Sequence, residues 1–276
     1  RDAQESRGLG DVYKRQIFDA ASIAPGDFTG FTFFIGSVSM LAATVWFLMQ
    51  HGQVDKKFKD SMLVAALITG IAAVHYFYMR EQWVAGLGSP TELRYIDWIL
   101  TVPLMVVEFA LLTGVGMRKL FWLSVVMLVT GYFGESGVTG VGNAAIWGGV
   151  SGAAYFLMAY EVGCLSIFGG PSGAVGNALT AGSGKIPEAG RMLQWFVLVG
   201  WAIYPLGYMA GTDGWYNFVA IDEGAMNIIY NVGDAINKIG FGMAVWLSLI
   251  HISEPTRLLS ISYGVVSLEK KRGGGG

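Results

Sequence analysis

The chain of 276 residues is 53% hydrophobic and only 14% charged, with a formal net charge of −2 and a positive mean hydropathy. Soluble domains usually carry about a quarter charged residues, so this composition indicates an integral membrane protein. It argues against nucleic-acid binding, because no basic surface is available to neutralise phosphates. The single Cys164 excludes an intramolecular disulfide, and no Cys/His cluster has metal-ligand spacing, so we expect no metal.

The two ends of the chain differ from its middle. Residues 1–25 are polar and contain no apolar run of the kind that a signal peptide requires. We interpret residues 1–25 and 251–276 as non-native sequence, translated from adapter DNA; the alternative is genuine disordered tails. In either case we assign no function to them and expect one domain over residues 26–250.

The middle of the chain contains apolar segments long enough to cross a hydrocarbon core of ~30 Å, for which about 20 residues suffice. Short polar or glycine-rich connectors, such as 51–57, 86–90 and 169–184, separate them. The sequence therefore predicts an all-α membrane protein with a bundle of seven transmembrane helices, over residues 28–50, 58–80, 91–113, 118–134, 143–165, 191–210 and 224–250.

Basic residues in the connectors predict how the bundle is oriented. Most fall at alternate connections, and only Arg80 and Arg94 fall toward the other side. The side richer in Lys and Arg should be cytoplasmic, so we expect the N-terminus outside and the C-terminus inside. The residues of the cytoplasmic set are Lys56, Lys57, Lys59, Arg118, Lys119, Lys185 and Arg191.

The third segment carries ionisable residues where an ordinary buried helix has none. Each charge at mid-membrane costs at least ~2.5–3.5 kcal/mol on insertion scales, so each is a functional hypothesis. On a helix, Asp97 and Thr101 share a face at i,i+4, with Arg94 one turn before Asp97. Asp97 and Glu108 are three turns apart, roughly 16 Å along the axis. The row resembles a path for charge.

The seventh segment adds an acid and a base on one face, Asp234 and Lys238. They could be a structural ion pair that holds helices together. Asp97 favours another interpretation, because two acids around one buried amine suggest a cation whose charge is held and then moved. A buried lysine is readily tuned and suits a Schiff base with an aldehyde.

These residues resemble those of the microbial rhodopsins, and specifically of the proteorhodopsin branch. The resemblance covers all seven segments and includes the runs Gly131-Tyr132-Phe133-Gly134-Glu135 and Gly200-Trp201-Ala202-Ile203-Tyr204-Pro205-Leu206-Gly207-Tyr208.

The resemblance implies that Lys238 carries all-trans retinal as a protonated Schiff base. Asp97 then matches the primary counterion and proton acceptor, and Asp234 the second counterion. Glu108 matches the cytoplasmic proton donor, which its apolar neighbours should keep protonated until the Schiff base needs refilling.

Arg94 matches the arginine that lies outward of the counterions, and Thr101 the hydroxyl one turn inward of the acceptor. His75 matches the histidine that contacts the acceptor carboxylate, although a lone membrane histidine is more often a packing residue. The resemblance further implies an outward proton pump: sodium pumps carry Asn, Asp and Gln at the positions of Asp97, Thr101 and Glu108.

The resemblance also places aromatic residues around the chromophore, where ordinary core packing is the alternative. They are Trp98, Trp201, Tyr204 and Pro205, with Tyr76 and Tyr208 close by. Met105 stands where green absorbers of the family have an apolar residue and blue ones have Gln, so we expect green absorption.

Gly148 stands where carotenoid-binding relatives have a glycine that opens a window onto retinal, so a carotenoid antenna is a further hypothesis. Simple helix packing is the alternative at this position.

We therefore expect a light-driven outward proton pump, a transporter rather than an enzyme, in the inner membrane of a bacterium. The resemblance implies a homo-oligomer, a pentamer or hexamer, in the lipid bilayer. One alternative is a sensory photoreceptor that signals to a membrane transducer, which would not need the donor Glu108. The other is a non-photoactive receptor or transporter, which would have no reason to keep Lys238 between two acids.

Overall fold

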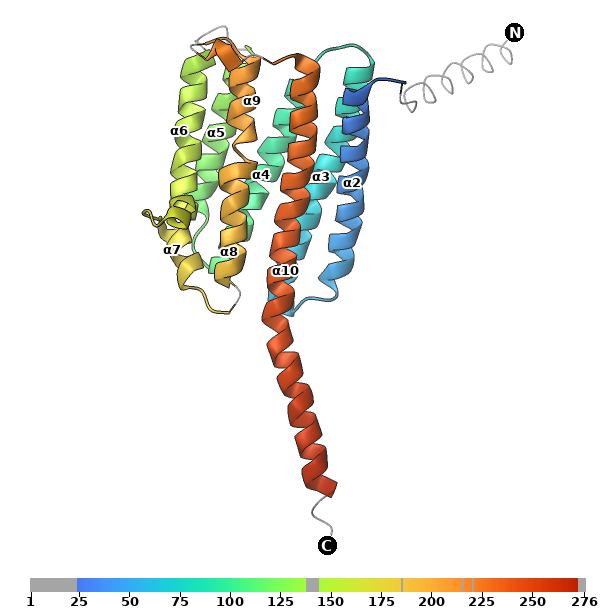
Figure 1. Ribbon diagram of the computed structural model, residues 1–276, viewed down its shortest axis with the longest axis vertical. Coiled ribbons are helices and arrows are strands. Elements are labelled where there is room, and N and C mark those ends of the chain that lie inside the picture. Colours follow the sequence, from blue (N-terminus) through green and yellow to red (C-terminus); the bar gives the residue numbers. More distant parts are fainter. Residues whose placement is uncertain (1–23, 138–143, 185, 215, 220, 273–276) are drawn as a thin grey trace, which may run out of the picture.

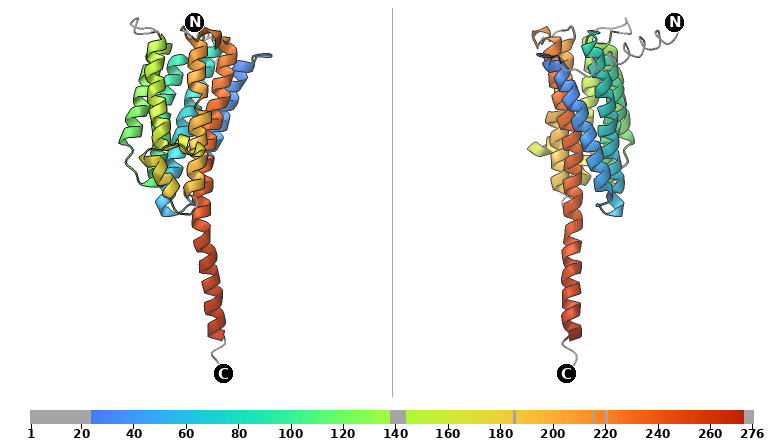
Figure 2. Two further views of the ribbon diagram at one scale, coloured as in Figure 1. Left: turned by 60° about the vertical axis from the view of Figure 1, so that its left-hand side comes forward. Right: turned by 90° about the vertical axis from the view of Figure 1, so that its right-hand side faces the viewer.

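The computed structural model describes residues 24–137, 144–184, 186–214, 216–219 and 221–272. The helices stand side by side in a bundle, and α10 continues well beyond its end (Figures 1 and 2). The helices that correspond to the predicted spans are α2 (Phe28–His51), α3 (Lys59–Val84), α4 (Thr91–Thr113), α5 (Arg118–Glu135), α6 (Ala144–Val162), α8 with α9 (Ile186–Trp195 and Ile203–Gly211) and α10 (Glu223–Arg272). Most of these bounds lie within a few residues of the predicted ones.

Length and hydropathy alone mark four of the described helical stretches as able to cross a membrane: 28–51, 59–84, 91–113 and 186–211. Many of their large apolar side chains face outward, as a lipid-facing surface requires. Among them Val45 is 52% exposed and Leu67 is 53% exposed. In a membrane protein such side chains meet lipid tails, so they need no further partner.

The helices pack in chain order. Neighbouring pairs from α2 to α6 are in contact, and α10 packs against α2, α3, α8 and α9, which closes the bundle. Across the ring, buried polar side chains of α4 and α10 meet, as Lys238 does with Asp97 at 2.6 Å.

The sixth span is not one regular helix, contrary to the simple prediction. Between α8 and α9 lies η3 (Phe196–Gly200), a π-helical segment. The wider turn leaves carbonyl groups without their usual helical partners, and side chains from other helices bond them. Tyr155 of α6 donates to the carbonyl of Val197 at 2.9 Å, and Asn237 of α10 donates to that of Gly200 at 2.8 Å. Such segments in membrane helices persist because neighbours satisfy the freed groups.

The connector predicted at 169–184 contains a short helix, α7 (Ala174–Ala181), which follows the 3₁₀ turn η2 (Cys164–Phe168). The carboxylate of Glu161, at the end of α6, accepts a hydrogen bond from the backbone N–H of Ala174 at 3.1 Å. Val175 and Leu179 turn inward and are at most 2% exposed. A capped first turn and an apolar face are enough to turn the connector into a helix.

The connections from α2 to α3 and from α4 to α5 lie at the same end of the bundle as α7 (Figure 1). The first includes η1 (Lys56–Phe58), and the second leads into Arg118. The basic residues of the predicted cytoplasmic set that are described therefore gather at one end, as their alternation along the chain requires.

The predicted boundary near residue 250 does not coincide with a helix end, because α10 continues to Arg272. That residues 251–276 are foreign to the native protein stays a prediction. The corresponding prediction for residues 1–25 lies almost entirely outside the described residues.

Candidate functional site

Lys238 lies in the middle of the bundle between two carboxylates. Its ammonium donates to Asp97 Oδ2 at 2.6 Å and to Asp234 Oδ2, and none of the three residues is more than 2% exposed. Asp234 and Lys238 are adjacent on one face of α10 at i,i+4, and Asp97 reaches them from α4. Buried charges persist only when paired, since the desolvation penalty is several kcal/mol per ion. The three residues that the sequence singled out therefore form one site.

Arg94 lies one turn from Asp97 on α4 and is 1% exposed. Its guanidinium donates to Asn227 Oδ1 at 2.6 Å and to Ser89 Oγ at 3.5 Å, and it stacks over the ring of Tyr230 at 4.8 Å. Within the described chain, the salt bridges of Asp97 and Asp234 go to Lys238 and none goes to Arg94. Arg94 thus faces the amide of Asn227 and acts on the acids through space.

Glu108 is 0% exposed, and within the described residues neither of its carboxyl oxygens has a hydrogen-bond partner. It lies on α4 eleven residues after Asp97, so roughly 16 Å of helix separates the two acids. It takes no part in the cluster around Lys238. The structure therefore contains two separate buried acid sites on one helix.

His75 and Thr101 bond to their own helices. His75 Nδ1 lies 2.8 Å from the carbonyl oxygen of Ile71, and Thr101 donates to the carbonyl of Asp97 at 2.8 Å. The expected contact between His75 and the acceptor carboxylate is therefore not a hydrogen bond, because Asp97 Oδ1 has no partner in the described residues. A charge on His75 would still act on Asp97 through space.

Aromatic rings surround the buried amine and its two acids. Trp98 meets Tyr204 edge-on with ring centroids 4.8 Å apart, and it meets Tyr230 at 5.5 Å. The hydroxyl of Tyr204 donates to Asp234 Oδ1 at 2.8 Å. The indole N–H of Trp98 is buried without a hydrogen bond in the described part of the chain. These rings exclude water from the ion cluster, as strong electrostatics requires.

The other expected pocket residues lie on α3, on α4 and in or just before α9. Tyr76 is 1% exposed and donates to the carbonyl of Tyr230 at 3.4 Å, and Met105 is 2% exposed on α4. Trp201 is 3% exposed, just before α9, and Pro205 is half-buried in it. The hydroxyl of Tyr208 donates to the carbonyl of Ala144 at 2.5 Å rather than to an acid of the Lys238 cluster.

Gly148 packs directly against Tyr208. A Cβ atom at Gly148 would lie 2.5 Å from Cε1 of that ring, whereas one at the neighbouring Gly149 would meet nothing within 4 Å. Helix packing is therefore sufficient to require glycine at position 148.

Sequence reasoning missed three residues around this site: Asn227, Tyr230 and Asn237. Asn227 binds Arg94, Tyr230 stacks on Trp98, and Asn237 donates to the hydroxyl of Tyr204 at 3.3 Å. All three lie on α10. The available signal was the presence of asparagines in an apolar span, where unpaired amides are costly.

A search of protein families matches residues 27–252 to the family described as bacteriorhodopsin-like protein. The green-light absorbing proteorhodopsin of gamma-proteobacterium EBAC31A08 is 37% identical over 250 residues, which cover 86% of this chain and 94% of the relative. The blue-light absorbing proteorhodopsin of gamma-proteobacterium Hot 75m4 is 41% identical over 251 residues, which cover 86% and 93%.

Solved structures of rhodopsins share the fold of this chain. The blue light-absorbing proteorhodopsin from Med12 superposes with a TM-score of 0.67 at 37% identity, covering 81% of this chain and 98% of that one. Xanthorhodopsin, described as a light-driven ion pump with dual chromophore, superposes with a TM-score of 0.69 at 26% identity, covering 85% and 98%.

Proposed function

The chain belongs to the bacteriorhodopsin-like family, and we propose that it is a light-driven pump that moves protons outward across the inner membrane of a bacterium. The observation that carries this proposal is the division of buried acids along α4. Asp97 contacts the Lys238 ammonium, and Glu108 is buried three turns away, where the hydroxyl of Ser61 lies beside its carboxyl group. A pump needs a group that receives the proton and a different group that replaces it.

The family implies a retinal chromophore, and the residues around Lys238 fit it. The lysine supplies a buried primary amine for an aldehyde, and the acids supply negative charge for the cation that results. Asp97 Oδ1 and the indole N–H of Trp98 are buried polar atoms without partners in the described structure. The site therefore has one hydrogen-bond acceptor and one donor that a bound group could use. When bound, retinal would supply light absorption and a change of shape.

The side chains of this protein then account for direction. Both acids contact the Lys238 nitrogen, and we assign receipt of the proton to Asp97, because its Oδ1 has no partner in the described residues whereas both oxygens of Asp234 are engaged. Asp234 is the second carboxylate beside the nitrogen, and the hydroxyl of Tyr204 holds it in place by donating to its other oxygen. Arg94 lies outward of both acids and disfavours return of the proton. Glu108 holds a proton, since burial disfavours the charged form and, in the described part of the chain, no salt bridge compensates it.

The outward direction rests on the orientation predicted from the basic residues. With the end that carries Lys56 and Arg118 in the cytoplasm, Arg94 at the start of α4 lies toward the outside, and Glu108 near its end lies toward the cytoplasm. Release then occurs beyond Arg94, and uptake occurs through Glu108. A sensory role is less well supported, because a slow signalling protein has no need for this donor.

The test is light-driven proton movement in cells that express the chain with retinal. We expect acidification of the medium that a protonophore abolishes and that persists when sodium or chloride is replaced. Asp97→Asn should abolish it. Glu108→Gln should slow recovery of the dark state by at least tenfold, and added azide should restore part of the rate. Alkalinisation of the medium, or a signal that requires sodium, would contradict the proposal.

An antenna is a secondary proposal. Xanthorhodopsin is described as having a dual chromophore, and this chain has glycine at position 148, packed against Tyr208. A carotenoid would lie on the outer surface of α6 and transfer energy inward. The oligomer expected from the resemblance, a pentamer or hexamer, likewise remains a proposal.

A further inference from the structure

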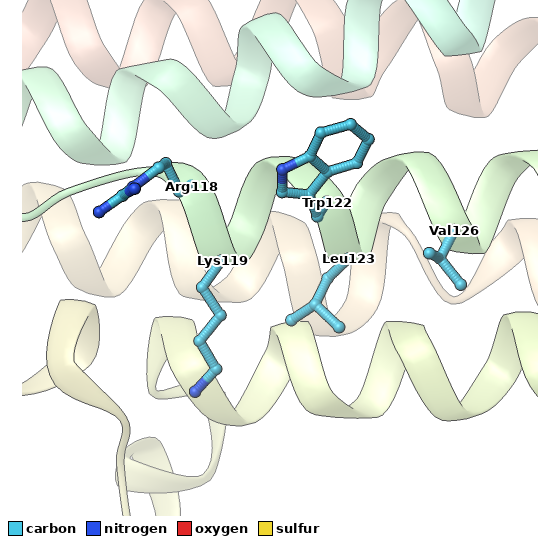
Figure 3. A pocket seen from close by; sticks show the side chains of 5 residues that line it. All are labelled: Arg118, Lys119, Trp122, Leu123 and Val126. Atoms are coloured by element: carbon cyan, nitrogen blue, oxygen red, sulfur yellow. The ribbon is translucent and has the colours of Figure 1, made fainter.

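The start of α5 forms a groove on the outside of the bundle. None of the residues that line it belongs to the site around Lys238. The groove is a shallow, open depression of about 530 Å³, and its lining comes from α5 alone. Basic side chains lie at the end of the helix and apolar ones follow over the next two turns: Arg118, Lys119, Trp122, Leu123 and Val126 (Figure 3). The groove thus has a cationic end and an apolar body.

An ion pair holds the cationic end of the groove in place. The ammonium of Lys119 is held 2.5 Å from Glu161, whose side chain is 7% exposed, and the side chain of Lys119 still remains 62% exposed. An ammonium has three protons, so Lys119 keeps donors for a second anion. Arg118 is exposed. The first turn of α5 has no acidic residue and no side-chain cap, so its backbone N–H groups also favour an anion.

The apolar body faces the lipid. Trp122 is 62% exposed and Val126 is 43% exposed, and they follow Arg118 at i+4 and i+8 on one stripe of the helix. Tryptophan is enriched where hydrocarbon meets headgroups. The stripe therefore crosses from headgroup depth into hydrocarbon depth over about two turns, or roughly 12 Å.

We propose that this groove binds one anionic phospholipid. Its phosphate would lie between Arg118 and Lys119, and an acyl chain would lie along Trp122, Leu123 and Val126. Charge complementarity selects an anionic headgroup, and basic pockets at the cytoplasmic end of membrane helices are typical of such recognition. A soluble phosphate would leave the apolar stripe unused. The leaflet, but not the binding, depends on the proposed orientation.

The test uses the full chain with retinal, purified in detergent and stripped of lipid. Native mass spectrometry would follow titration with phosphatidylglycerol and, separately, with phosphatidylcholine. We expect tighter binding of phosphatidylglycerol and about fivefold weaker binding in Arg118→Gln, as for the loss of one cation near a membrane surface. Arg118 is the preferred site of substitution, because changing Lys119 would leave Glu161 buried without its partner. The visible absorbance confirms that each variant is folded.

Lys56→Gln is the matched control, because it removes an exposed charge at the same end of the bundle, outside the groove. It should leave the affinity for phosphatidylglycerol unchanged. An equal loss in both variants would mean diffuse attraction to charge and would overturn the proposal. Equal binding of phosphatidylcholine would also overturn it.

A second variant separates a lipid from free phosphate. Trp122→Ala should weaken binding of phosphatidylglycerol, and water-soluble glycerol phosphate should not compete at lipid concentrations. Competition at those concentrations would indicate a plain phosphate site. Cross-linking of two copies through α5, with exclusion of added lipid, would assign the groove to a second copy of the chain. Either result would overturn the proposal.

Discussion

Three ionisable side chains, each at most 2% exposed, determine what this protein can do: Lys238, Asp97 and Asp234. Two carboxylates and one ammonium leave one negative charge in excess, which the guanidinium of Arg94, one turn from Asp97 on α4, partly offsets. Removing one partner of a buried pair typically costs about 3–5 kcal/mol, because the other charge is left unpaired. A cluster this costly for stability is retained where moving a proton depends on it.

His75 is a residue whose influence can be tested apart from its hydrogen bond to Ile71. We expect His75→Asn to shift the pH midpoint of the colour change that accompanies titration of Asp97, because a charge on the imidazole acts on that acid through space. A spectroscopic pH titration of the purified protein measures it. His51→Asn, at the end of α2, is the control. An unchanged midpoint in His75→Asn would show that the histidine only packs.

Gly148 can be tested against its immediate neighbour. We expect Gly148→Trp to displace Tyr208 and to abolish energy transfer from an added xanthophyll, measured as a carotenoid band in the excitation spectrum. Gly149→Trp should leave the pigment absorbance unchanged, because a side chain there has open space. If no carotenoid band appears in the unmodified protein, Gly148 serves packing alone.

Among the elements, the interrupted sixth span differs most from a regular helix. The π segment η3 separates α8 from α9, which carries Tyr204 and Pro205. Asn237, next to Lys238, bonds both the carbonyl of Gly200 and the hydroxyl of Tyr204. The distortion of one helix is thus tied to the residue that neighbours Lys238.

This coupling predicts a specific pair of substitutions. A Cβ at Gly200 would lie 2.0 Å from Asn237 Oδ1, so Gly200→Ala should lower the thermal bleaching temperature. Asn237→Ala should cost about 1 kcal/mol for its lost hydrogen bonds in the membrane. The double variant should lose less stability than the two single variants added together, because the clash disappears when the amide is removed. Strict additivity would mean that the contact is not the cause.

At the scale of the whole molecule, the site depends on helices from both ends of the chain. α10 closes the bundle against α2 and α3, so Lys238 can meet Asp97 only when the seventh span has docked. The buried polar residues of the site lie between positions 75 and 238. The long continuation of α10 beyond the bundle carries none of them (Figure 1).

Removal of residues 251–276 should therefore leave the chromophore and its pumping intact. We expect the truncated protein to keep the same absorption maximum and light-driven acidification within about twofold, after correction for expression. Absorbance and pH recordings on the same cells measure both. Loss of colour would place the tail among the parts that hold the bundle together.

The sequence by itself determined the helices and the residues of the charge pathway. Apolar runs of membrane length predict spans from local composition, and the alternation of basic residues places their ends. Asp97, Glu108, Asp234 and Lys238 were visible because charges in apolar helices are costly enough to stand out singly.

Only the tertiary structure decided what those residues touch. Arg94 binds Asn227 rather than an acid, and His75 bonds its own helix. The π segment η3 interrupts the sixth span, where side chains of α6 and α10 bond its carbonyl groups. Asparagine side chains and a π turn are hard to interpret from the sequence around them. Their stabilisation comes from hydrogen bonds to groups on other helices. The spacing of charges is local, whereas the pairing of hydrogen bonds is set by how the helices pack.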